Sequence, residues 1–160
     1  MQPLRLLFDE CCSKRLPGKL AEIYAEDYQI ETKHLTEFFS KGDDDADWLP
    51  LIESGGWIVI TTDRGKDPKK PKLPVICERL GINHLMFTSE LLNAGYAAQK
   101  QALLCVWPQL VRITALPKGT GVMLGYRAFK HGLTMWPVLS IANKSFDAWC
   151  AEKNVSFPKI

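Results

Sequence analysis

The amino-acid sequence predicts a three-layer α/β/α domain with a mainly parallel central sheet and an irregular C-terminal extension. Two apolar runs, residues 4–8 and 57–62, are each followed directly by a carboxylate. The second run is uncharged and consists of β-branched and aromatic residues, which is typical of a strand buried on both faces of a parallel sheet. Stretches with helical spacing alternate with such runs, as in βαβ units.

Length and composition favour one globular domain. The chain has 160 residues, of which 46% are hydrophobic and 24% charged, enough for a full hydrophobic core. It contains no run of about 18 apolar residues and does not begin like a signal peptide, so we expect a cytoplasmic protein without a membrane partner. Five cysteines without a C-x-x-C pair predict reduced, mostly buried thiols. The adjacent Cys11 and Cys12 are expected to be small buried apolar residues and not nucleophiles, because no base is placed to activate them.

The first half of the chain alternates between strand and helix. Leu16, Leu20 and Tyr24 lie on one side of a helix, and Pro17 falls in its first turn, where the missing N–H is harmless. Asp44 or Asp45 can cap the next helix. The predicted elements are a strand at 4–8, a helix at 13–28, an irregular strand at 28–35, a short amphipathic helix that begins after the Asp44 or Asp45 cap and ends at Gly55 and Gly56, and a strand at 57–62.

The second half is predicted to complete the sheet and then to leave it. Pro108 is expected to stop a long helix that begins at Ser89. The predicted elements are a loop at 64–74, a helix at 75–80 ended by Gly81, a strand at 82–88, a helix from 89 to about 107, and a final strand at 111–116. Residues 1–116 would form the main domain. Residues 117–160 would form an extension packed on it, with a hairpin and a short helix at 146–149.

Carboxylates are concentrated where the predicted strands end. Asp9 and Glu10 follow the first strand, Asp63 follows the strand at 57–62, and residues 43–47 contain four aspartates. The carboxyl ends of parallel strands meet at one edge of a sheet, and carboxylates brought together there repel unless a cation is bound. Oxygen ligands without histidine or cysteine favour Mg²⁺ or Mn²⁺ over zinc. Phosphodiester hydrolysis is the reaction such a site suits best.

The net charge of +2 is unevenly distributed. Residues 111–160 hold seven Lys or Arg and two acids, hence +5, which leaves −3 for residues 1–110. A polyanionic substrate suits this arrangement, because cations bind its phosphates while the acids hold metal. Both sets of charges could equally be solvated surface.

Three stretches, LLFDECCSKRL, DADWLPLIESGGWIVITTDRG and LGINHLMF, resemble the PIN-like nuclease domains. The resemblance covers about residues 4–115 and is to the compact subgroup that begins with an Asp-Glu pair, many members of which are toxins of type II toxin–antitoxin pairs. It implies an acidic quartet of Asp9, Glu10, Asp45 and Asp63, with Arg15 as the basic residue of the first helix. The chain departs from the pattern after Asp63, where Arg64 and a lysine-rich loop follow.

The resemblance implies a metal-dependent endoribonuclease. Asp9, Asp45 and Asp63 would hold Mg²⁺ or Mn²⁺, and Glu10 or Asp47 would bind the ion through water or orient the attacking water. The expected partners are the RNA substrate and a cognate antitoxin, and a homodimer is left open. The candidate phosphate ligands are Arg15, Arg64, Lys66, Lys69 and Lys70.

Other interpretations of the same residues stay open. The acids could be helix caps and turn residues, and the fold could serve as a catalytically silent binding module that acts through a protein partner. A phosphoacceptor receiver domain also has an acid pair, an aspartate and a Thr or Ser at successive strand ends. Thr88 and Ser89 match the last of these, but Leu116-Pro117-Lys118 reverses the expected Lys-Pro order. The three histidines follow no ligand spacing and are expected to be structural.

Overall fold

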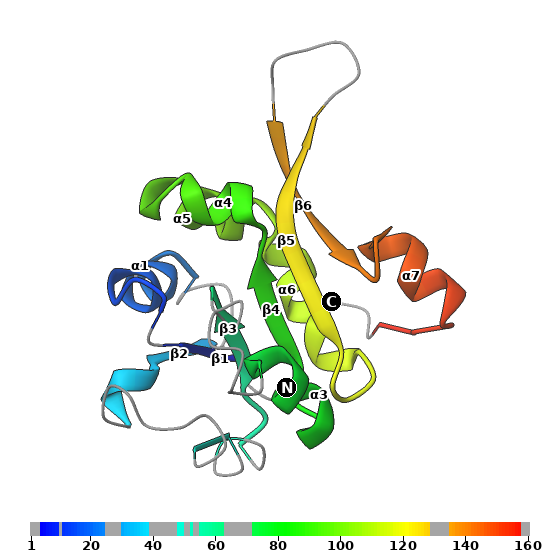
Figure 1. Ribbon diagram of the computed structural model, residues 1–160, viewed down its shortest axis with the longest axis horizontal. Helices are drawn as coiled ribbons and strands as arrows, with labels where there is room; N and C mark the ends of the chain where they lie inside the picture. Colours follow the sequence, from blue (N-terminus) through cyan, green and yellow to red (C-terminus); the bar gives the residue numbers. More distant parts are fainter. Residues whose placement is uncertain are drawn as a thin grey trace.

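A computed structural model of the chain contains a seven-stranded sheet with the strand order β2-β1-β3-β4-β5-β6-β7 (Figure 1). It describes residues 4–9, 11–24, 30–38, 48–49, 52, 55–62, 72–128 and 135–157. The first five strands in this order run parallel, and β6 and β7 are antiparallel to their neighbours. The strands are β1 Leu4–Phe8, β2 Ile30–His34, β3 Ile58–Thr61, β4 His84–Phe87, β5 Gly121–Ala128, β6 Met135–Ile141 and β7 Lys144–Ser145. The predicted α/β class with a mainly parallel sheet is confirmed.

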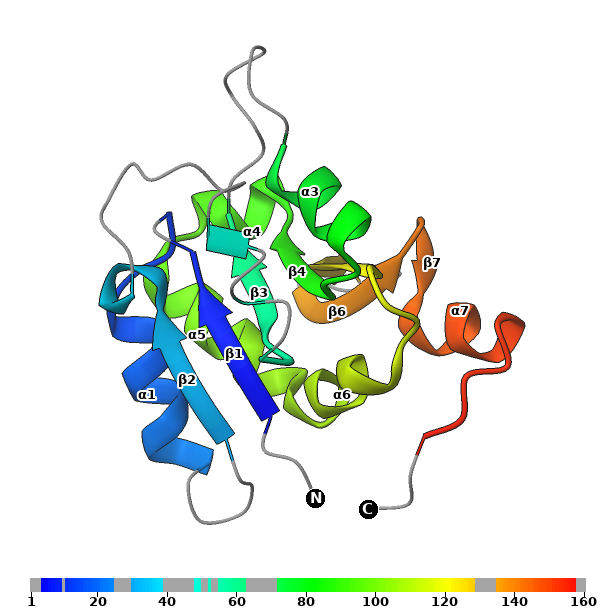
Figure 2. The same ribbon diagram turned by 90° about the horizontal axis from the view of Figure 1, so that it is seen from below.

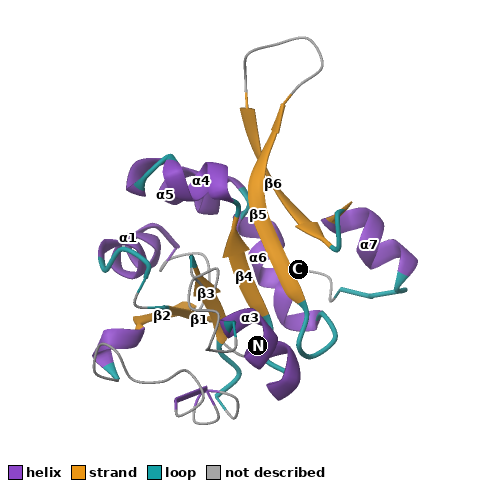
Figure 3. Cartoon of the chain, viewed as in Figure 1, coloured by secondary structure: helices purple, strands orange, loops and turns teal. Residues whose placement is uncertain are grey.

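Helices cover the sheet from two sides (Figures 2 and 3). The larger hydrophobic cluster joins one face of the sheet to α1 (Arg15–Tyr24), α5 (Tyr96–Cys105), α6 (Trp107–Arg112) and α7 (Phe146–Glu152). The smaller cluster joins the other face to α3 (Leu73–Leu80) and to the helical residues Trp48, Leu49 and Ile52. The remaining elements are α4 (Ser89–Asn93) and the 3₁₀ turns Leu35–Glu37 and Ile113–Ala115. The described chain therefore forms three layers.

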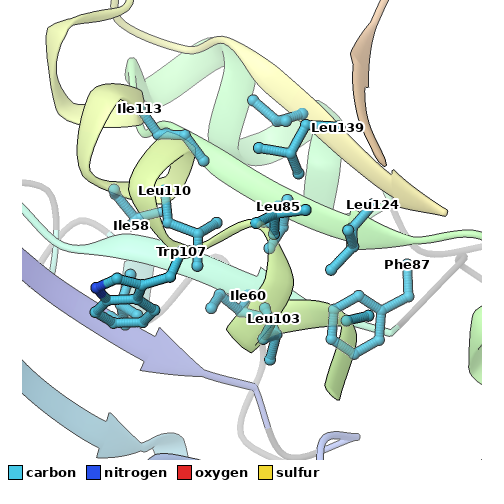
Figure 4. Packing of buried hydrophobic residues seen from close by; sticks show 14 of the residues in the cluster. Ile58, Ile60, Leu85, Phe87, Leu103, Trp107, Leu110, Ile113, Leu124 and Leu139 are labelled. Atoms are coloured by element: carbon cyan, nitrogen blue, oxygen red, sulfur yellow. The ribbon is translucent and has the colours of Figure 1, made fainter. Parts of the chain in front are cut away.

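Strand side chains alternate between the two hydrophobic clusters. Ile58 and Ile60 of β3 belong to the larger cluster, whereas Val59 between them belongs to the smaller one. Figure 4 shows the two isoleucines among Leu85, Trp107 and their neighbours. All four residues of β3 are buried. The prediction that this strand is covered on both faces is confirmed, as expected for a parallel strand with helices on each side.

The predicted strand at 111–116 is wrong, because residues 111–115 are helical. They form the end of α6 and the 3₁₀ turn that follows it. Pro108 lies in the first turn of α6, where its missing N–H leaves no hydrogen bond unmade, so it starts a helix instead of ending one. Leu110 and Ile113 then fall three residues apart and are both buried in the larger cluster. The fifth parallel strand of the sheet is β5.

The predicted long helix from Ser89 is also wrong, since it is two helices. It is interrupted between α4 and α5 at Gly95, whose φ of 88° lies in the left-handed region that glycine favours. Other predicted elements are confirmed with shifted ends. Those elements are β1, β2, β4, α1, α3 with Gly81 as its left-handed C-cap, and the closing helix α7.

The predicted C-terminal hairpin is present as β5 and β6. It lengthens the main sheet, since β5 pairs in parallel with β4, and it projects beyond the helices (Figure 1). Trp136 on β6 is 52% exposed, whereas Trp107 is buried in the core. None of the helices in the described part of the chain combines the length and apolar character needed to cross a membrane.

Candidate active site

The strand order places a topological switch point between β1 and β3. From β1 the chain first adds β2 on one side and then crosses back to add β3 on the other. The loops that leave β1 and β3 therefore turn to opposite faces, and open α/β sheets bind ligands in the crevice that this leaves beyond the strand ends. Asp9 follows β1 and Thr62 follows β3, directly before Asp63 in the sequence.

Asp9 is a buried carboxylate at this switch point, with 3% of its surface exposed. Its Oδ2 accepts a hydrogen bond of 2.9 Å from the Oγ1 hydroxyl of Thr61, the last residue of β3. Its backbone N–H donates to the carbonyl of Ile60, also at 2.9 Å. A carboxylate withdrawn from water needs such donors, because its desolvation is costly. Thr61 therefore fixes the orientation of the Asp9 carboxylate.

Side chains from both neighbouring strands hold the loop that begins at Asp9. The Thr62 hydroxyl donates to the carbonyl of Cys11 at 3.1 Å. On the other side, His34 ends β2, and its Nδ1 accepts from the backbone N–H of Thr36, which leaves the proton on Nε2. Nε2 donates this proton to the carbonyl of Cys12 at 3.0 Å. The loop that follows Asp9 is thus anchored to β2 and β3 together.

The Cys12 thiol is not available as a nucleophile. Burial raises the pKa of this thiol far above its ordinary value, and the nearby negative charge of Asp9 raises it further. The Sγ atom lies 3.4 Å from the carbonyl oxygen of Ile60, toward which its proton points. Since the thiolate is the reactive form, the predicted role of Cys12 as a small buried apolar residue is supported. Cys11 is exposed, which corrects the expectation for that thiol.

We expect a thiol-reactive reagent to distinguish two classes of cysteine in the native protein. Cys11 and Cys105 are exposed, whereas Cys12, Cys77 and Cys150 are buried. A titration with Ellman's reagent at neutral pH should therefore give two fast thiols when native and all five after denaturation in guanidinium. Rapid modification of Cys12, identified by peptide mass spectrometry, would contradict the buried loop.

Most of the predicted site residues lie outside the described residues, and their assignment stays a prediction. Asp9 is described at the expected strand end, and Arg15 is the exposed first residue of α1. The described residues alone contain no cluster of three His, Cys, Asp or Glu side chains that could hold a metal ion. The predicted residues outside the described part are Glu10, Asp45, Asp47, Asp63, Arg64, Lys66, Lys69 and Lys70.

The described surroundings of Asp9 fit a hard divalent cation. The carboxylate accepts from the Thr61 hydroxyl, both ring nitrogens of His34 are engaged in hydrogen bonds, and the Cys12 thiol stays protonated. The atoms left to bind a metal ion are oxygens, which are the ligands that Mg²⁺ and Mn²⁺ prefer. Carboxylates from the neighbouring predicted positions would complete the ligand set.

Sequence reasoning missed the positioning role of Thr61, Thr62 and His34. The sequence pattern indicates the two threonines only as part of an uncharged strand and His34 only as a structural residue. A usable signal was present, since a hydroxyl at the end of a strand buried on both faces must find a partner. Thr61 is fully buried and finds that partner in Asp9.

The comparison with known families agrees with this geometry. A family model described as a PIN-like domain matches residues 4–72, a range that runs from β1 to the residue before α3. PIN-like domains form a nuclease-type superfamily. No curated protein and no solved structure matches the chain. Over residues 4–72, which contain Asp9, Thr61 and both strands of the switch point, the chain is similar to the PIN-like domain.

Proposed function

We propose that the protein is a metal-dependent endoribonuclease that hydrolyses RNA phosphodiester bonds. The observation that carries the proposal is the buried Asp9 carboxylate at the switch point, held by Thr61 two residues before Asp63 in the sequence. A nuclease needs a cluster of acids at this position in the fold, and the sequence provides acids at both strand ends. The similarity to PIN-like domains over residues 4–72 supports the same function.

Each site residue has a chemical role in this proposal. Asp9, Asp45 and Asp63 would hold Mg²⁺ or Mn²⁺, and Glu10 or Asp47 would orient the attacking water. A bound ion of this kind polarises the phosphate and stabilises the leaving oxygen. Thr61 keeps the Asp9 carboxylate in one orientation, so little reorganisation is needed during the reaction. The candidate phosphate ligands are Arg15, Arg64, Lys66, Lys69 and Lys70.

The proposal extends to a partner. We propose that the nuclease is the toxin of a toxin–antitoxin pair. A cognate antitoxin would then inhibit it by occupying the acidic groove or by inserting a cation into it. Such a pair would work in the cytoplasm, where its RNA target is found. Loss of RNA cleavage on adding the partner, with recovery when the partner is removed, would support this part of the proposal.

Calorimetric titration with Mn²⁺ or Mg²⁺, with cleavage of single-stranded RNA measured in the same buffers, tests the function. We expect the wild type to bind metal saturably and to cleave RNA, and Asp63→Asn to lose both. Asp147→Asn is the matched control, because Asp147 is an exposed carboxylate on α7 that pairs with Arg112 and lies outside the site. It should behave like the wild type.

Three outcomes would contradict the nuclease. Metal binding without cleavage, together with phosphorylation by acetyl phosphate, would identify a receiver domain. Receiver domains have the same order of parallel strands, β2-β1-β3-β4-β5, as this chain. Metal binding with neither cleavage nor labelling would favour a silent binding module. No metal binding in either protein would make the carboxylates caps and surface charges.

A further inference from the structure

Two cationic side chains from different helices approach the ring of Tyr96. The Arg15 guanidinium carbon lies 5.8 Å from the ring centroid, and the Lys100 Nζ also lies 5.8 Å from it. Arg15 is the first residue of α1, and Tyr96 is the first residue of α5. A cation at this distance from an aromatic ring is attracted by the ring's quadrupole.

Acidic groups do not compensate this pair of cations within the described part of the chain. The ion pairs found there involve other residues, and neither α1 nor α5 has a carboxylate in its first turn. The residue before Arg15 is Lys14, which is exposed. One cation on the ring would suffice to join the two helices. A second like charge at the same ring adds repulsion, which a bound anion would offset.

The helices that carry the two cations follow the carboxyl ends of parallel strands, the end of the sheet at which Asp9 lies. Arg15 begins the helix that follows the Asp9 loop, and α5 follows the carboxyl end of β4 through α4. Both helices cover the same face of the sheet and lie side by side (Figures 1 and 2). Tyr96 thus brings Lys100 of α5 next to a basic residue adjoining the switch point.

We propose that Arg15 and Lys100, held in place by Tyr96, form a binding site for backbone phosphates of single-stranded RNA at the same end of the sheet as the acidic site. This site rests on the proposed function and adds α5 to the surface that binds the substrate. Contacts of this kind are independent of base sequence and release counterions. The geometry makes Lys100 a phosphate ligand and Tyr96 the residue that positions both cations.

Fluorescence anisotropy with labelled oligouridine in EDTA tests the site, since binding is then measured without cleavage. We expect Lys100→Ala and Arg15→Ala each to weaken binding about fivefold at 50 mM salt, and to reduce the slope of log K against log salt by about 0.7. Lys118→Ala is the control. Lys118 is exposed and precedes the amino end of β5, whereas Asp9 lies at the carboxyl ends of the parallel strands, so affinity and slope should not change.

Substitutions of Tyr96 separate positioning from charge. Tyr96→Phe keeps the ring and should bind oligouridine like the wild type. Tyr96→Leu keeps both charges but removes the ring, and should weaken binding about threefold at low salt, because both cations lose their common anchor. Thermal unfolding of each variant ensures that folded proteins are compared.

The outcomes distinguish this inference from the proposed function. If Lys100→Ala binds with the affinity and slope of Lys118→Ala while the wild type cleaves RNA, the phosphate site is refuted and the nuclease stands. If binding depends on Arg15 and Lys100 but no metal supports cleavage, the site stands and the nuclease falls. If the wild type does not bind oligouridine at low salt, the phosphate site is refuted, and the nuclease is judged by the metal-dependent cleavage assay alone.

Discussion

Replacing Asp9 with asparagine should abolish RNA cleavage while leaving the fold intact. The amide keeps an oxygen to accept the Thr61 hydrogen bond, and its size matches the carboxylate in a position that is 3% exposed. What is lost is the negative charge needed to hold a divalent ion. A metal ion supplies several kcal/mol of transition-state stabilisation. A loss of ~4 kcal/mol lowers the rate about a thousandfold, and we expect kcat/KM to fall by that factor.

The measurement combines cleavage of single-stranded RNA with thermal unfolding in EDTA. Removing a charge from a buried position takes away its desolvation cost, so the unfolding temperature of Asp9→Asn without metal should be equal to or above that of the wild type. In excess Mn²⁺ the order should reverse, because only the wild type gains stability from the ion. Asp147→Asn should match the wild type in every arm. Full cleavage by Asp9→Asn would remove Asp9 from the site.

The strands of the sheet could be predicted from the sequence where burial on both faces requires apolar residues. β1 and β3 are apolar runs covered on both faces, so their residue types show the strand directly. β5 was harder to place in the core of the sheet, because Gly121 and Gly125 suggest turns. The structure gives them a packing role. A Cβ on Gly121 would lie 2.7 Å from Nε2 of His84, and one on Gly125 would lie 2.4 Å from Cγ2 of Thr88.

The strand prediction for 111–116 failed because composition and burial disagree there. Val111, Ile113 and Thr114 are β-branched and favour a strand, yet the buried positions Leu110 and Ile113 recur with helical spacing. The segment is helical because burying these two side chains outweighs the local preference for a strand. The ends of β1 and β3, by contrast, follow from the sequence closely enough to place Asp9 directly after β1, next to the end of β3.

Hydrogen bonds of the site could not be predicted in the same way. Which hydroxyl meets which carboxylate depends on the register of β1 against β3, in which Phe8 lies opposite Ile60. That register brings Thr61 of β3 to Asp9, the residue after β1. A shift by one residue would have turned Thr61 to the other face. Sequence patterns give the strands but not this register.

Replacing Thr61 with valine is the second change with a large expected effect. Valine has the shape of threonine without the hydroxyl, so Asp9 Oδ2 would lose a donor that lies 2.9 Å away in a fully buried contact. Groups that orient a metal ligand typically contribute 10- to 100-fold to affinity or activity, and we expect the Mn²⁺ affinity to fall by about that range. The unfolding free energy at neutral pH should fall by about 1–3 kcal/mol, since a buried acceptor is left without this partner.

Thr61→Ser provides the control that separates orientation from packing. Serine keeps the hydroxyl and removes only a methyl group, so metal affinity should return to near the wild-type value even though stability falls by about 1 kcal/mol for the lost apolar contact. If Thr61 acted only in packing, serine would be no better than valine in calorimetric Mn²⁺ titrations. Equal metal affinities for the serine and valine variants would therefore show that the hydrogen bond to Asp9 does not position the carboxylate.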